Sequence, residues 1–344
     1  MTAFNFIQPF VFLVDPERAH RMTIAALSLL PKTSPRPFAS SLASTVAGIS
    51  FPSPVGLAAG FDKDAEVPSA MLSLGFGFVE IGTVTPLAQS GNPKPRLFRL
   101  VEDQAVINRM GFNNSGLPRA HERLKARTQN GLIGVNIGAN KDTSDRIADY
   151  VTAMRVMADV ADYLTVNISS PNTPGLRGLQ DAGALTELLD ALVAARLPAD
   201  PPLFLKLAPD LDSAGVDAVV KVAAGRVDAL IIANTTISRP KLASRHAGQT
   251  GGLSGAPLAA LAREQLCVFR KSSGGAMPLI AVGGIADADD AYARIRSGAS
   301  LVQIYSALVY HGPSLAKHIA EGIADRLTRD GFASVAEAVG VDAN

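Results

Sequence analysis

The sequence of 344 residues predicts an α/β fold, a (β/α)8 TIM barrel that follows a short N-terminal helical extension. Two observations carry this prediction. Short apolar runs recur eight times from residue 54 onward, and segments with apolar residues at helical spacing lie between them. Strands that are apolar along their length and joined by helices form a parallel sheet covered by those helices. Eight such units favour a closed barrel over an open doubly wound sheet.

The eight expected strands can be placed by their bounding turn residues, at 54–60, 78–84, 132–139, 163–169, 202–209, 229–236, 278–285 and 301–308. Helical spacing is clearest at 186–197, 213–224 and 314–327. The stretch GFGFVEIG (75–82) resembles a dinucleotide-binding glycine motif, but it runs into a strand instead of opening a helix. We therefore reject it as a nucleotide fingerprint. A long insertion, 86–131, separates the second and third strands.

The first 30 residues predict two short amphipathic helices. MTAFNFIQPFVFLV is apolar and aromatic, and the polar DPERAHR follows it. Asp15 is expected to be the N-cap of the second helix, with Pro16 at its first position. The stretch lacks a basic region before its apolar core, so we expect no signal peptide, and no run reaches the roughly 20 apolar residues of a transmembrane helix. We expect an N-terminal segment at 1–45 and a barrel domain at 46–344.

The composition argues against several classes of function. Lys and Arg total 32 against 31 Asp and Glu, and no basic stripe stands out, so a nucleic-acid partner is not expected. The single cysteine, Cys267, excludes an internal disulfide and is expected to be a small buried hydrophobe in a helix. No histidines have metal-ligand spacing and there is no Cys/His cluster, so no metal site is expected.

Polar residues gather at the carboxyl ends of the expected strands, where barrels place their chemistry. Packing explains few of them, and they include two lysines among many neutral donors and acceptors. Such a mouth suits a planar, amide-bearing ligand with some negative charge. The residues are Lys63, Thr83, Asn136, Asn167, Ser169, Ser170, Lys206, Asn234, Thr235, Thr236, Tyr305 and Ser306.

Two features at these strand ends suggest specific chemistry. The loop GGLSG (251–255), the turn VGGI (282–285) and the end of the last strand predict a phosphate site, because glycines let backbone N–H groups approach an anion. Three roles are compatible with Lys206: a strand-end lysine that reaches solvent, a Schiff-base nucleophile, or a cation beside a cofactor that gains negative charge. Sequence alone does not separate the last two. Glu80, inside a strand, has no assigned role.

Nine motifs follow one another along the chain, about one per strand or loop: AAGFDK, IGTVTP, NRMGFNN, NISSPNTPGLR, LKLAPD, ANTT, GGLSG, VGGI and IYSAL. Together they closely resemble the dihydroorotate dehydrogenase family, the flavin enzymes of pyrimidine synthesis. The serine at 170 and the apolar N-terminal extension resemble the membrane-associated, quinone-using class, whereas the soluble class carries cysteine as base and lacks the extension. The resemblance implies oxidation of (S)-dihydroorotate to orotate through FMN, by a peripheral protein on the cytoplasmic side of the cell membrane.

The resemblance also implies roles for the matched positions. Ser170 would be the base that removes the C5 proton, while the hydride leaves C6 for the flavin. FMN contacts are implied for Ala59, Gly60, Lys63, Thr83, Asn136, Asn167, Lys206, Ala233, Gly255, Gly284, Tyr305 and Ser306. Substrate contacts are implied for Lys63, Asn108, Arg109, Met110, Gly111, Phe112, Asn167, Asn172, Asn234 and Thr235. At Ala233 the chain departs from its relatives, which often carry threonine there.

Other interpretations stay open at this point. A barrel with a Schiff-base Lys206 would be an aldolase of phosphorylated sugars, and a non-catalytic barrel would leave the polar strand ends unexplained. Residues 1–30 are expected to rest on the membrane and admit quinone to the flavin. The alternative is that they pack on the barrel as an ordinary N-terminal cap.

Overall fold

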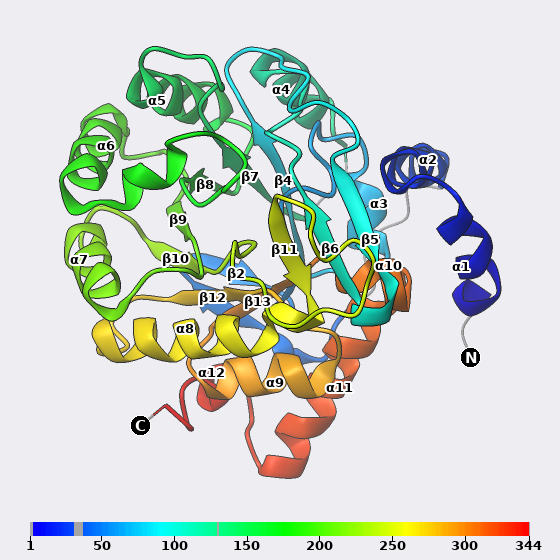
Figure 1. Ribbon diagram of the computed structural model, residues 1–344. Coiled ribbons are helices and arrows are strands. Elements are labelled where there is room, and N and C mark those ends of the chain that lie inside the picture. Colours follow the sequence, from blue (N-terminus) through cyan, green and yellow to red (C-terminus); the bar gives the residue numbers. More distant parts are fainter. Residues whose placement is uncertain (1–2, 31–36, 129–130, 344) are drawn as a thin grey trace.

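A computed structural model describes residues 3–30, 37–128 and 131–343. Eight parallel strands form a closed barrel in the order β10, β12, β13, β3, β4, β7, β8 and β9 (Figure 1). Each strand falls within a run expected from the sequence, so the predicted barrel is confirmed. The strands are β3 Val55–Leu57, β4 Phe78–Val84, β7 Leu132–Ile137, β8 Tyr163–Asn167, β9 Leu203–Leu207, β10 Ala229–Ile232, β12 Leu279–Val282 and β13 Leu301–Ile304.

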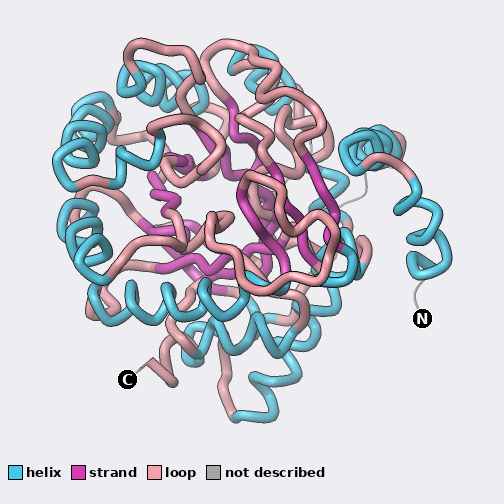
Figure 2. Tube along the Cα trace, viewed as in Figure 1, coloured by secondary structure: helices cyan, strands magenta, loops and turns pink. Residues whose placement is uncertain are grey.

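Helices surround the barrel (Figure 2), and the predicted helical segments correspond to α6, α7 and α11. The α-helices are α3 Pro68–Ser73, α4 Leu117–Lys125, α5 Arg146–Met157, α6 Ala182–Ala195, α7 Ser213–Ala223, α8 Ala259–Ser272, α9 Ala288–Arg296, α10 Ala307–His311, α11 Leu315–Asp330 and α12 Val335–Ala338. Short 3-10 helices are η1 Ser40–Leu42, η2 Val101–Asp103, η3 Leu176–Gln180 and η4 Ala256–Leu258. The expected burial of Cys267 was wrong, because α8 buries Leu266 and Phe269 and leaves Cys267 exposed.

Aromatic side chains fill the amino-terminal end of the barrel. Tyr163 points inward from β8 and packs in one cluster with Phe51, which belongs to the hairpin of β1 (Ser44–Val46) and β2 (Ile49–Phe51). Gly134 makes room for this packing, since a Cβ there would lie 2.0 Å from the Tyr163 ring. Because side chains fill the amino-terminal end of the barrel, space for a ligand is left at its carboxyl end.

A three-stranded antiparallel sheet lies at the carboxyl end of the barrel. It consists of β5 (Leu97–Leu100), β6 (Ala105–Asn108) and β11 (Gly252–Gly255). The segment 251–255, expected to be a phosphate loop, is therefore mostly a strand that pairs with β6. At Gly252 a Cβ would lie 1.9 Å from Thr235 Oγ1, so the glycine serves close packing between this sheet and the barrel.

The N-terminal helices α1 (Ala3–Leu13) and α2 (Pro16–Ser28) lie to one side of the barrel (Figure 1). Asp15 caps α2 as predicted, since its carboxylate accepts the backbone N–H of Arg18 at 2.9 Å. Glu17 of α2 pairs with Arg96 at 2.8 Å, which ties the extension to the insertion. The expected boundary between 1–45 and 46–344 falls inside β1. In the residues described, no helix combines the length and apolar character needed to cross a membrane.

Candidate active site

A cavity of about 550 Å³ opens at the carboxyl end of the barrel and continues between α1 and α2. Most residues expected to contact cofactor or substrate line it, although they come from strands and loops far apart in the chain. They are Ala59, Gly60, Lys63, Thr83, Asn108, Met110, Gly111, Phe112, Asn167, Ser170, Asn172, Lys206, Asn234, Thr235, Gly255, Gly284, Tyr305 and Ser306.

Arg109, Asn136 and Ala233 are not among the lining residues. The guanidinium of Arg109 instead donates a hydrogen bond to the side chain of Gln249 at 3.0 Å. Asn136 is fully buried behind Thr83. Ala233 is buried in a cluster with residues of η4 and α8. These three residues are therefore placed to support the walls of the cavity from outside.

A chain of buried amides supports the floor of the cavity. Thr83 Oγ1 donates to Asn136 Oδ1 at 2.5 Å, and Asn167 Nδ2 donates to the same oxygen at 3.0 Å. The amide nitrogen of Asn136 donates to Glu80 at 2.8 Å. Asn167 Oδ1 accepts hydrogen bonds from the Ser169 N–H at 3.2 Å and hydroxyl at 3.0 Å. The network thereby fixes the amide of Asn167 and the start of the loop that carries Ser170.

Ser170 lies in this loop, directly after β8, and is buried. Its Oγ accepts the backbone N–H of Asn172 at 3.2 Å, and the Asn172 side chain donates to Asn108 Oδ1 at 3.2 Å. Among the described residues, the buried Thr173 hydroxyl has no hydrogen-bond partner. The loops after β6 and β8 therefore meet at a serine whose neighbours are neutral hydrogen-bonding groups.

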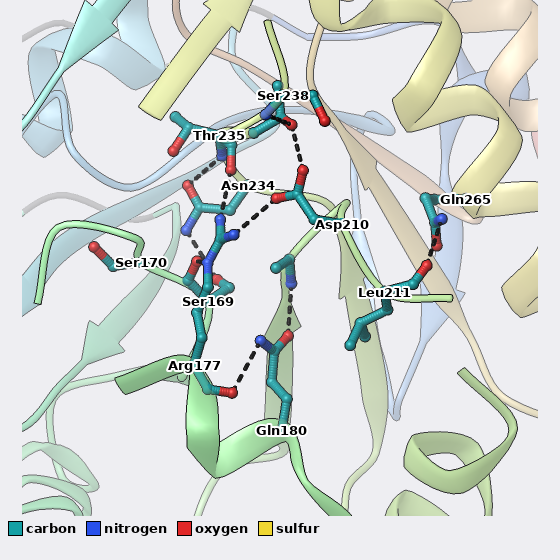
Figure 3. Close-up of polar contacts among 12 residues, drawn as sticks. Ser169, Ser170, Arg177, Gln180, Asp210, Leu211, Asn234, Thr235, Ser238 and Gln265 are labelled. Atoms are coloured by element: carbon teal, nitrogen blue, oxygen red, sulfur yellow. Dashed lines mark hydrogen bonds and ion pairs between the residues drawn. The ribbon is translucent and has the colours of Figure 1, made fainter. Parts of the chain in front are cut away.

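Arg177 joins the loop after β8 to the loops after β9 and β10 (Figure 3). Its Nε donates to the Ser169 carbonyl at 3.0 Å, and a terminal nitrogen donates to the Thr235 carbonyl at 2.9 Å. The other terminal nitrogen pairs with the Asp210 carboxylate at 2.8 Å, and Asp210 also accepts from the Thr236 hydroxyl. A planar guanidinium can hold three acceptors in fixed directions, which an ammonium cannot. The sequence analysis assigns no role to Arg177 or Asp210, although Arg177 ends the motif NISSPNTPGLR and Asp210 ends the motif LKLAPD.

Lys63 follows β3 and donates to the Gly60 carbonyl at 2.7 Å. Burial lowers the pKa of Lys63 to about 8, because desolvation disfavours the ammonium form. The neighbouring Asp62 is fully buried, and its carboxylate accepts the backbone N–H groups of Glu66 and Val67 at 2.8 Å each. Asp62 therefore shapes the loop, whereas Lys63 faces the cavity.

Lys206 points into the barrel from β9, and only 5% of its side chain is exposed. This burial rules out the interpretation of a lysine that reaches solvent. Its Nζ lies 4.0 Å from Glu80 Oε1, and no described residue accepts a hydrogen bond from it. Burial lowers the pKa of Lys206, and the negative charge of Glu80 acts in the opposite direction.

Glycine backbone lines the cavity near Tyr305 and Ser306. Gly283 and Gly284 have φ values of +105° and +71°, and a Cβ at Gly284 would lie 2.3 Å from Ala259 Cα. Only glycine fits this close approach. Successive glycines of this kind present N–H groups that suit an anion. Within the described residues, no group of three or more His, Cys, Asp or Glu side chains could hold a metal ion.

The chain matches the protein-family model described as dihydroorotate dehydrogenase over residues 41–327. The chain belongs to the dihydroorotate dehydrogenase family. It is 60% identical over 339 residues to dihydroorotate dehydrogenase (quinone) of Erythrobacter litoralis, with 98% of this chain and 99% of that one covered. It is 58% identical over 347 residues to dihydroorotate dehydrogenase (quinone) of Novosphingobium aromaticivorans, with 99% of each covered. The predicted relation to the quinone-dependent class of this family is confirmed.

Solved structures of dihydroorotate dehydrogenase agree with this family assignment. The crystal structure of the Eimeria tenella protein in complex with ferulenol superposes with a TM-score of 0.90 at 40% identity, covering 95% of this chain and 96% of that chain. The ligand-free crystal structure from the same organism gives a TM-score of 0.91 at 40% identity, covering 96% and 100%. Membership of a dehydrogenase family leaves the aldolase and binding-module interpretations without support.

Proposed function

We propose that the protein oxidises (S)-dihydroorotate to orotate through bound FMN and passes the electrons to a membrane quinone. The observation that carries this proposal is the continuity of the cavity. One space joins Ser170 and the buried Lys206 to the N-terminal helices α1 and α2. Relatives named dihydroorotate dehydrogenase (quinone), similar over the whole chain, support the same substrate and acceptor.

The residues at the carboxyl end of the barrel fit FMN. The Lys206 ammonium borders the cavity without a hydrogen-bond acceptor among the described residues, so it suits a ring heteroatom. FMN supplies the acceptor for the hydride that leaves C6 of the substrate. Residues that would hold its ring are Ala59, Gly60, Lys63, Thr83, Asn167 and Lys206. Gly255, Gly284, Tyr305 and Ser306 would hold its phosphate, with Asn136 and Ala233 supporting from behind.

Ser170 is the proposed base for the proton at C5 of dihydroorotate. A hydroxyl is a weak base unless its own proton can leave along a hydrogen-bonded chain. The Asn172 N–H donates to the Ser170 oxygen and favours negative charge there. The buried Thr173 hydroxyl, which has no hydrogen-bond partner among the described residues, is our candidate for the next group in the chain.

Asparagine side chains from three loops would hold the carboxylate and amide groups of the substrate. Asn108, Asn172 and Asn234 line the cavity near Ser170, and orientation of this kind contributes as much as proton transfer. Asn167, Thr235, Lys63 and the segment 110–112 complete the proposed substrate site. Arg109 would act indirectly, because its guanidinium fixes that segment from outside the cavity.

The N-terminal helices would rest on the cytoplasmic face of the cell membrane and admit quinone. Phe6, Phe10 and Leu13 are 69%, 71% and 85% exposed. Burying such a face stabilises the bound state by roughly 25 cal/mol per Å² of apolar area. A helix that lies in the membrane interface gains this stabilisation without spanning the membrane. Val11 and His20 line the cavity, so a quinone has a covered route from the lipid. The ordinary-cap alternative does not explain the exposed face.

Anaerobic addition of dihydroorotate tests the cofactor and the substrate together. The purified protein should be yellow, dihydroorotate should bleach the flavin absorbance, and added quinone should restore it. A protein that binds no flavin, or whose flavin dihydroorotate leaves unchanged, would refute the proposed function. Borohydride trapping of a carbonyl substrate on Lys206 would instead favour the aldolase.

A further inference from the structure

Glu80 is a carboxylate inside the barrel, at a position that the proposed reaction leaves without a role. It lies on β4, is fully buried, and faces the interior one layer above the aromatic cluster of Tyr163. Carboxylates are seldom fully buried unless they are paired. The partners of Glu80 therefore indicate what it does.

Neutral donors surround this carboxylate. The amide nitrogens of Asn136 and Gln303 each donate to it at 2.8 Å, and the Tyr163 hydroxyl donates at 3.2 Å. Hydrogen bonds to the ionised form of a carboxylate favour that form. The network thus stabilises a negative charge in the barrel interior without neutralising it.

Lys206 supplies the opposite charge, with its Nζ at 4.0 Å from Glu80 Oε1. Among the described residues that face this pair, Asn136 on β7 and Gln303 on β13 carry no charge. Tyr163 on β8 stays neutral, because burial and the nearby Glu80 raise its pKa well above the usual value. Glu80 is therefore the counter-charge of Lys206 within this layer. A buried ion that loses its partner is strongly disfavoured, and its usual response is to neutralise.

We propose that Glu80 is a positioning residue of the reaction, the buried counter-charge that keeps Lys206 a cation where the flavin ring gains negative charge. This inference rests on the proposed function, because it takes Lys206 to face the flavin. Reduction of bound FMN by the substrate would bring two electrons and one proton to its ring. With Glu80 present, Lys206 already carries its proton and takes up none. Without Glu80, Lys206 is neutral before reduction and must take one further proton from water onto Nζ.

The midpoint potential of the bound flavin, measured against pH in the holoenzyme, reports that extra proton. Wild type should take up one proton for each two electrons. Glu80→Gln should take up close to two protons for each two electrons at alkaline pH, so the slope of the midpoint potential against pH should double. At alkaline pH the midpoint potential of Glu80→Gln should therefore lie below that of the wild type. Tyr163→Phe is the matched control, because it removes a donor to Glu80 but leaves the charge, and it should keep the wild-type slope.

Several results would overturn the proposal. One is a Glu80→Gln potential that equals or exceeds the wild-type potential with an unchanged slope, since Lys206 would then stay charged alone. Another is a Tyr163→Phe slope that changes as much as that of Glu80→Gln. If Glu80→Gln does not fold, the double variant with Lys206→Met should fold, because neither charge is left unpaired. Failure of the double variant as well would overturn the counter-charge role.

The two proposals fail in distinguishable ways. Wild-type protein that holds no flavin, or that dihydroorotate does not bleach, refutes the proposed function. Normal bleaching of the wild type together with an unchanged Glu80→Gln potential refutes only the role of Glu80.

Discussion

The guanidinium of Arg177 lies 2.8 Å from the carboxylate of Asp210, and this ion pair holds together the loops that carry the proposed base and substrate site. The same guanidinium donates to the carbonyls of Ser169 and Thr235. Ser170 follows the first of these residues directly. The position of the Ser170 hydroxyl relative to the substrate site therefore depends on the planar side chain of Arg177.

Arg177→Lys should retain FMN but slow flavin reduction by dihydroorotate roughly 10- to 100-fold. Lysine keeps the charge but cannot donate in three fixed directions, and hydrogen bonds that involve a charged group contribute about 1.5–3 kcal/mol each. Stopped-flow absorbance measures the rate. Arg226→Lys is the matched control, because Arg226 pairs with Asp190 at 2.7 Å on the outer surface and should leave the rate unchanged. Equal rates of flavin reduction in both variants would show that Arg177 does not position Ser170 for the reaction.

Orotate affinity should fall as the pH rises above about 8, because burial lowers the pKa of Lys63 to about 8. Below this pH the ammonium is present and attracts the carboxylate of the ligand. Above it the charge is lost, and the dissociation constant should rise by up to tenfold for each pH unit. Lys63→Met should bind weakly at every pH, with no inflection near 8. A wild-type affinity that stays constant into the alkaline range would exclude Lys63 from the ligand site.

The barrel could be predicted from the sequence because its signals are local. Each strand is a short apolar run and each helix has its own periodicity, so strands such as 163–167 and helices such as 315–330 are visible without knowledge of their partners. The motif residues at strand ends could be grouped for the same reason, since parallel strands present their carboxyl ends on one side.

Features that depend on contacts between distant segments could not be predicted. β11 pairs with β6 across more than a hundred residues of sequence, and its Gly-rich segment reads locally as a loop. Glu80 acquires its partners only when β4, β8, β9 and β13 close the barrel. The family resemblance implies a substrate contact for Arg109 without saying where its side chain points, and tertiary contacts direct its guanidinium to Gln249.

The exposed face of α1 should anchor the protein to membranes. Replacing Phe6, Phe10 and Leu13 together by serine removes much of the apolar area that would enter the lipid interface, so the variant should no longer sediment with vesicles. Flavin reduction by dihydroorotate should stay at the wild-type rate, since that substrate arrives from water. Leu197→Ser is the matched control, because Leu197 is 65% exposed at a distant site and its loss should leave vesicle binding unchanged.

Deletion of residues 1–30 extends this test to quinone. The deleted protein should lose quinone reduction, because the cavity would lose the wall that α1 and α2 provide. Dihydroorotate should still bleach the flavin while the barrel remains folded. Equal quinone turnover by the deleted and full-length proteins would favour the ordinary-cap alternative.

The rate of the reductive half-reaction in Ser170→Ala tests whether Ser170 is the base. The variant and the wild type are mixed anaerobically with saturating dihydroorotate, and the loss of flavin absorbance is followed from neutral to alkaline pH. Ser170→Ala should retain FMN and react slower by roughly 10² to 10⁴, the usual contribution of a general base. The wild-type rate should rise with pH as the serine or its relay loses a proton more readily, and the variant should lose this dependence. Near-normal flavin reduction by Ser170→Ala, with the wild-type pH profile, would contradict the assignment of Ser170 as the base.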